Sequence, residues 1–125
     1  MSQIKTLFDY NGAKYEFDIR DADDAGKYEE AIENMKNDEA KLPKVGKSSE
    51  IIKAHCAMIK SFFDTVFEDG AGDAVCGSKN NISACYDAYE AFLAFAKEQS
   101  DDVVRAKNVF AKYSNRQQRR AAGKS

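Results

Sequence analysis

The chain contains one histidine and three cysteines, the residue types that most readily hold a metal ion or act as a nucleophile. His55 and Cys56 are adjacent, and adjacent side chains on a helix point about 100° apart, so the two would not bind one metal ion together. A site built from His55, Cys76 and Cys85 would require the loop at 70–80 to fold back. A thiol–histidine nucleophile would also need an orienting acid at a defined place and an oxyanion-binding motif, and the sequence shows neither. We therefore predict no catalytic residues, no metal, no cofactor, and three free, buried thiols.

Acidic and glycine-rich segments have structural explanations as well. Asp18, Asp21, Asp23 and Asp24 fall where a hairpin ends and a helix begins, and nothing nearby in the sequence indicates a catalytic carboxyl group there. Gly70-Ala71-Gly72 follows a predicted helix, whereas a phosphate-binding loop follows a strand. We interpret this segment as the stop of a helix and a turn.

The aromatic residues are spaced as in the core of a helical protein. Tyr86, Tyr89, Phe92 and Phe95 recur at helical spacing, which favours a packed face over a platform for stacking nucleic-acid bases. Residues 1–111 carry a net charge of −7, because five of the basic residues lie from Lys112 onward. An acidic body opposes nucleic-acid binding, so a nucleic-acid partner is not expected at that surface.

Length and composition favour one ordinary globular domain. A chain of 125 residues, 43% apolar and 32% charged, is long enough to bury a core without disulfides or metal. The N-terminal segment does not resemble a signal peptide, and no apolar run approaches the roughly 18 residues of a membrane span. We expect a cytosolic protein with no membrane partner.

The first twenty residues predict a β-hairpin. Ile4, Thr6 and Phe8 alternate with other residues, Asn11-Gly12 is a strong turn signal, and alternation then resumes. Period two would place three apolar side chains on one face of the second strand: Tyr15, Phe17 and Ile19.

Helices are predicted from there on. Asp21 would cap a first helix that ends before Pro43, and the next runs from Ser48 to Phe67 with a wide apolar face that should form the centre of the core. Ile52, Cys56, Ile59, Phe63 and Val66 make up the middle of that face.

The second half should hold a short helical turn and two further helices. Ala74 to Cys76 is the turn, and Asn80 or Asn81 would cap the helix that follows. Ser100-Asp101-Asp102 would cap a separate last helix with its own apolar residues: Val103, Val104, Ala106, Val109 and Phe110. The predicted fold class is mainly α with a small N-terminal β-hairpin (α+β), the hairpin packed on a bundle of about four helices.

The chain end is basic and lacks apolar periodicity, so we predict a single helical domain over 1–113 and a flexible basic tail over 114–125. Three interpretations of the tail stay open: a solvated end, a docking peptide for an acidic partner, or a weak nucleic-acid arm. As a docking peptide it would use Arg116, Gln118, Arg119 and Arg120.

Three segments resemble one family of phage proteins. They are the ending Lys112-Tyr-Ser-Asn-Arg-Gln-Gln-Arg-Arg120, the stretch 15–24 leading into Tyr28-Glu-Glu-Ala-Ile32, and Phe62-Phe-Asp-Thr-Val-Phe67 before a glycine-rich turn. The ending is similar to the Asn-Arg-x-Gln-Arg-Arg ending common among tail assembly chaperones of siphophages and related prophages of Firmicutes.

The resemblance implies a non-enzymatic chaperone in the cytoplasm of the bacterial host that is absent from the mature virion. Such chaperones bind the long, helical tape measure protein while the tail tube polymerises on it. The tape measure protein is therefore the expected partner, with the tail tube protein and a homo-oligomer as further candidates. The alternative function is a small phage-encoded regulator or inhibitor whose basic tail binds nucleic acid or a host protein.

Overall fold

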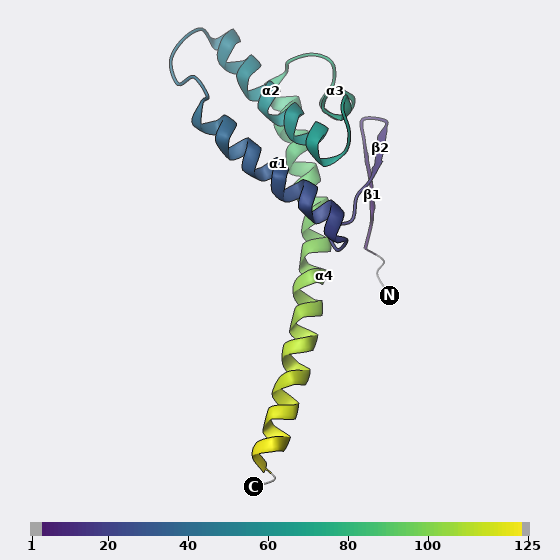
Figure 1. Ribbon diagram of the computed structural model, residues 1–125. Coiled ribbons are helices and arrows are strands. Elements are labelled where there is room, and N and C mark those ends of the chain that lie inside the picture. Colours follow the sequence, from purple (N-terminus) through teal and green to yellow (C-terminus); the bar gives the residue numbers. More distant parts are fainter. Residues whose placement is uncertain (1–3, 124–125) are drawn as a thin grey trace.

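The computed structural model describes the backbone of residues 4–123 and the side chains of residues 4–114. Two strands precede four helices: β1 Leu7–Tyr10, β2 Ala13–Glu16, α1 Ala22–Ala40, α2 Ser48–Val66, α3 Ala71–Cys76 and α4 Ile82–Gly123. Figure 1 shows the hairpin beside a group of helices from which α4 extends. The predicted fold class, mainly α with an N-terminal hairpin, is confirmed.

The hairpin forms as its residue pattern predicts. β1 and β2 pair antiparallel, and Asn11 and Gly12 make the turn with φ of 52° and 79°, values that suit a type I′ turn. Phe8 and Phe17 are 4% and 1% exposed, so the apolar face of the hairpin lies on the helices. Asn11 Nδ2 donates to the carbonyl oxygen of Val75 at 2.8 Å, which attaches the turn to α3.

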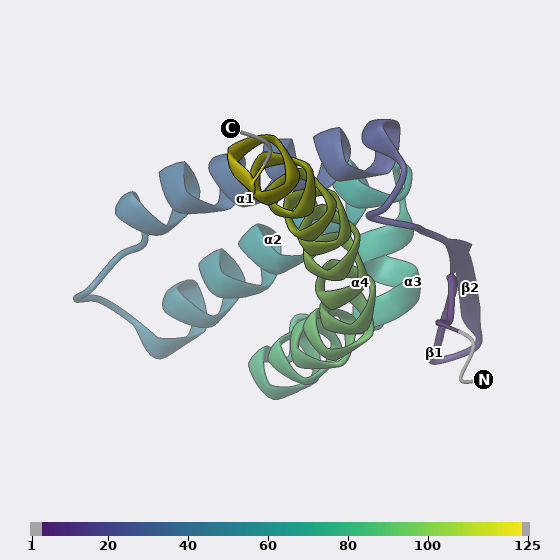
Figure 2. The same ribbon diagram turned by 90° about the horizontal axis from the view of Figure 1, so that it is seen from below.

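The first two helices run side by side and are joined by the loop at one end of the molecule (Figure 2). α1 begins after Asp21, as predicted, but the side chain of Asp21 makes no capping hydrogen bond. Asp24, in the first turn, instead accepts from the backbone N–H of Asp18 at 2.9 Å. An acid from the first turn therefore holds the chain that enters α1, much as in a capping box.

Phe92 of α4 is at the centre of the core and is fully buried. The predicted apolar face of α2 packs here, and its Phe63 is also fully buried. Aromatic rings whose centroids lie about 4.5–7 Å apart prefer edge-to-face or offset geometry, and most rings around Phe92 are tilted or edge-on to it. Seven described aromatic side chains have ring centroids 5.3–6.2 Å from that of Phe92: Phe8, Phe17, Tyr28, Phe62, Phe63, Phe67 and Phe95.

α3 is longer than the turn predicted at Ala74 to Cys76, and it begins directly after Gly70. Gly70 has φ of 91°, which favours glycine, and it ends the turn that follows α2. Gly72 lies inside α3, where a Cβ atom would collide with the backbone of Lys60 in α2. Its N–H donates to Asp64 Oδ1 at 2.7 Å. The absence of a side chain at Gly72 therefore allows α3 to approach α2 closely.

α4 differs most from the prediction. Asn81 caps it, since Asn81 Oδ1 accepts from the N–H of Ala84 at 3.0 Å. The predicted break at Ser100-Asp101-Asp102 is wrong, because the helix continues without interruption to Gly123. Ser and Asp favour the cap by only about 1 kcal/mol, and neither Gly nor Pro occurs between Ile82 and Ala122 to stop the helix. Helical backbone also continues across 113/114, where a flexible tail was predicted to begin.

Candidate binding surface

One face of α4 is apolar over most of its length, and only its first part is covered by the rest of the protein. Cys85, Ala88, Phe92, Ala96 and Gln99 are buried on this face. The same spacing of three and four then continues into residues that lie beyond the body. We call the following residues the apolar stripe: Val103, Ala106, Val109, Phe110 and Tyr113.

Exposure rises abruptly along this face. Val109 is 58% exposed, Phe110 75% and Tyr113 64%. Figure 1 shows the reason: the C-terminal part of α4 projects past α1, α2, α3 and the hairpin, so that none of these elements lies beside it. We call residues 103–123 of α4 the arm. Val104, Val109 and Phe110 were predicted to belong to the apolar set of a separate last helix; they are instead exposed residues in the second part of α4.

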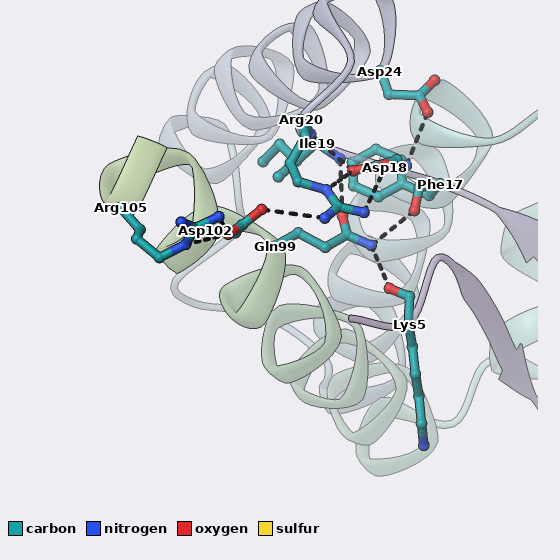
Figure 3. A network of polar contacts seen from close by, with 9 residues as sticks. All are labelled: Lys5, Phe17, Asp18, Ile19, Arg20, Asp24, Gln99, Asp102 and Arg105. Carbon is teal, nitrogen blue, oxygen red and sulfur yellow. Dashed lines mark hydrogen bonds and ion pairs between the residues drawn. The ribbon is translucent and has the colours of Figure 1, made fainter. Parts of the chain in front are cut away.

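Gln99 marks the boundary between the covered and uncovered parts of this face. Its side chain is fully buried, and Figure 3 shows it turned toward the N-terminal segment. Gln99 Nε2 donates to the carbonyl oxygens of Lys5 and Phe17 at 2.8 and 2.9 Å, and Gln99 Oε1 accepts from the N–H of Ile19 at 2.9 Å. One amide thus satisfies three backbone groups and attaches the hairpin to α4.

An ion-pair network lies just beyond Gln99 (Figure 3). Arg20 Nε is 2.8 Å from Asp18 Oδ1, and an Arg20 guanidinium nitrogen is 3.2 Å from Asp102 Oδ2. Arg105 of the arm also pairs with Asp102, at 2.7 Å. The hydrogen bond from Arg20 holds the pKa of Asp18 below its ordinary value. Such surface pairs stabilise only modestly. Of these three, the pair between Arg20 and Asp102 joins the segment before α1 to α4 at the start of the arm.

Charge is divided at the same point in the chain. All 21 acidic residues lie at or before Asp102, together with 12 of the 19 basic residues, which gives that part a net charge of −9. The seven remaining basic residues lie in 103–125, where the sequence has no acid. The arm therefore combines an apolar stripe with uniformly positive flanks.

The residues considered for metal binding or nucleophilic chemistry have ordinary structural surroundings. His55 Nδ1 lies 2.7 Å from the hydroxyl oxygen of Tyr86, which accounts for one polar atom of this half-buried ring. Cys56, Cys76 and Cys85 are free and buried. Burial raises the pKa of Cys56 to about 11 and also raises those of Cys76 and Cys85, so the thiolate form is disfavoured. Among the described residues, no group of three or more His, Cys, Asp or Glu could hold a metal ion.

The four residues predicted to bind a partner, Arg116, Gln118, Arg119 and Arg120, all lie within the helical backbone of the arm. Their side chains lie outside the described part of the structure. Gln99 was not among the predicted site residues, although its position is a signal: it is a polar residue in register with Phe92 and Ala96 on an inward face. Across residues 4–123, no helix is both long and apolar enough to cross a membrane.

Comparison with known proteins gives one match. Residues 11–123 match the model of a family of unknown function (DUF6673). The chain belongs to this family. The matched range includes the hairpin turn, the four helices described above and the arm. No curated protein and no solved structure matches the chain. The function must therefore be argued from the surface itself.

Proposed function

We propose that the protein is a non-enzymatic binding protein, a tail assembly chaperone that binds the tape measure protein of a tailed bacteriophage during tail assembly. The observation that supports this proposal is the uncovered apolar stripe on the arm. Exposed contiguous apolar surface often marks an interaction site, and a narrow stripe on a projecting helix suits a helical partner. The resemblance of three segments to such chaperones is the reason for proposing the tape measure protein as the partner.

The proposal has consequences for where the protein acts. A chaperone of this kind works in the cytoplasm of the bacterial host and is absent from the mature virion. The tail tube protein is a second candidate partner, and a homo-oligomer is a candidate state. The proposal needs no catalytic residue, metal or cofactor.

Co-expression tests the proposal directly. The tape measure protein, encoded by a long neighbouring reading frame, is produced alone, with this protein, and with an unrelated acidic helical protein of similar size. We expect only this protein to raise the soluble fraction of the tape measure protein and to co-purify with it. An unchanged soluble fraction would contradict the proposal.

The residues predicted from the sequence have their own test in the same assay. Changing Arg116, Arg119 and Arg120 together to Ala should weaken retention of the tape measure protein, because an arginine fork binds carboxylates bidentately. Higher salt should weaken retention as well, since exposed charges are screened beyond about 8 Å at physiological ionic strength. Full retention by this triple variant would remove these residues from the binding surface.

A phage-encoded regulator or inhibitor is the second candidate, and the charge of the arm favours it. Seven basic residues without an acid from 103 onward would suit nucleic acid or an acidic host enzyme. A gel shift with duplex DNA at low salt separates the two. Tight binding that depends on the arm, with no effect on the tape measure protein, would favour the regulator.

A further inference from the structure

We infer that the arm binds an amphipathic α-helix with acidic flanks, packed lengthwise along the apolar stripe. This inference rests on the proposed function and specifies the chemistry of the partner at that site. It identifies the occupant of the stripe as a segment of another protein, and the geometry and charge of the arm support it in three steps.

The spacing of the stripe is that of a helix-pairing seam. Val103, Ala106, Phe110 and Tyr113 are separated by three, four and three residues, as are the a and d positions of two consecutive heptads. Inside the body, the same register holds Phe92, where it packs against other helices. The uncovered residues thus continue a face that is already used for helix packing.

The extent of the stripe limits the partner. Residues 103–113 span about 16 Å at 1.5 Å per residue, or three helical turns. Small Ala106 between larger neighbours leaves room for a side chain of the partner, as in knobs-into-holes packing. A contact of this length should be reversible, which suits a chaperone that must release its client.

Charge decides between the candidate occupants. Pairing two arms would bring six positive charges against six, because 103–123 contains no acid, so a second arm is disfavoured. By helical angle, Lys112 borders one side of the stripe and Lys107 the other, while Arg105, on the same side as Lys112, is paired with Asp102. A helix with Glu or Asp beside its apolar seam would complement both borders.

Synthetic helices supply the test. Three 21-residue peptides are titrated into the full-length protein by calorimetry. The first has Leu at a and d and Glu at the flanking positions. The second replaces each Glu by Lys, and the third keeps the Glu composition but scrambles the Leu positions. We expect binding of the first alone, with an affinity that falls as salt increases.

Two matched variants locate the site. Phe110→Gln should lower the affinity for the Glu peptide by about ten-fold or more, because Phe110 is the largest wholly apolar side chain of the stripe and is 75% exposed. Val45→Gln, at a residue 86% exposed in the loop between α1 and α2, should leave the affinity unchanged. Lys107→Glu with Lys112→Glu should shift the preference toward the Lys peptide. Circular dichroism and the melting temperature of each variant check that the fold is intact.

Several results would overturn the inference. These are no binding of the Glu peptide, equal binding of the Glu and Lys peptides, or binding unaffected by Phe110→Gln. Self-association in sedimentation that Phe110→Gln abolishes would make a second copy the occupant, and arm-dependent DNA binding would make nucleic acid the ligand.

The two proposals fail separately. If the tape measure protein stays soluble with the Phe110→Gln variant, the chaperone function stands and the site is elsewhere. If the Glu peptide binds but the tape measure protein stays insoluble, the site stands and its natural partner is a different helical protein.

Discussion

The two parts of α4 carry the same apolar pattern and have opposite environments. From Ile82 to Gln99, the inward face is buried under α2, α3 and the hairpin. From Val103 to Tyr113, the face continues in register but is largely exposed. The comparison shows that helical periodicity identifies a face suited to packing without saying whether the same chain covers it. The uncovered part is therefore the strongest candidate for a binding surface in the described residues.

The largest effect is expected from replacing one phenylalanine in each part of α4. Phe92→Ala should lower the free energy of unfolding by about 3–5 kcal/mol, because it removes a fully buried ring and leaves a cavity among seven aromatic neighbours. Phe110→Ala should change it by no more than about 0.5 kcal/mol, since the ring is 75% exposed. Urea denaturation of both variants measures the difference. Equal losses would mean that the arm packs against the body in solution.

A second, smaller effect is expected at the boundary residue. Gln99→Leu should lower the free energy of unfolding by about 2–4 kcal/mol, because each buried backbone group left without a partner costs about 1–3 kcal/mol and water should satisfy some of them. The groups affected are the carbonyls of Lys5 and Phe17 and the N–H of Ile19.

Gln99→Glu sharpens the same test. A carboxylate could still accept from Ile19 but could donate to neither carbonyl while ionised, so this variant should be destabilised and should regain part of its stability on acidification. Wild-type stability for both variants would show that the hairpin does not depend on this amide.

The ion pairs beside Gln99 predict a pH dependence. The pKa of Asp18 is lowered in the folded protein, chiefly by the hydrogen bond from Arg20, so its contribution to stability is complete above the ordinary value near 3.8. That contribution is lost as pH falls through the lower folded value. Melting temperature against pH should therefore drop less for Asp18→Asn than for wild type below about pH 4. Parallel curves would contradict the role of this pair.

No effect on stability is expected from removing metal ions or adding a reductant, which is the smallest of the expected effects. A chelator and a reductant together should leave the melting temperature unchanged, because the apolar faces suffice for a chain of this length. The three buried thiols, whose pKa values are raised, should react with a thiol reagent only after denaturation. A large drop in melting temperature with the chelator alone would instead support a metal site formed by His55, Cys76 and Cys85.

Local chemistry allowed several elements to be predicted closely. Asn11-Gly12 determined the hairpin turn, Asn81 the start of α4, and the wide apolar face of 48–67 the central helix, all from contacts within a few residues. The candidate surface was harder to predict. The basic residues near the chain end were identified, but the apolar residues beside them were assigned to a separate last helix of the bundle and not to a binding surface, because an exposed and a buried stripe have the same spacing.

The sequence by itself determined which residues form helices and strands, which face of each is apolar, and how charge is divided along the chain. These depend on side-chain type and short-range spacing. The tertiary structure shows that α4 continues past Asp102: no Gly or Pro stops the helix there, and Asp102 pairs with Arg20, distant in sequence, instead of capping a new helix. It also decided where burial ends: the hairpin reaches as far as Gln99, and beyond it no element of the described chain extends to cover the stripe.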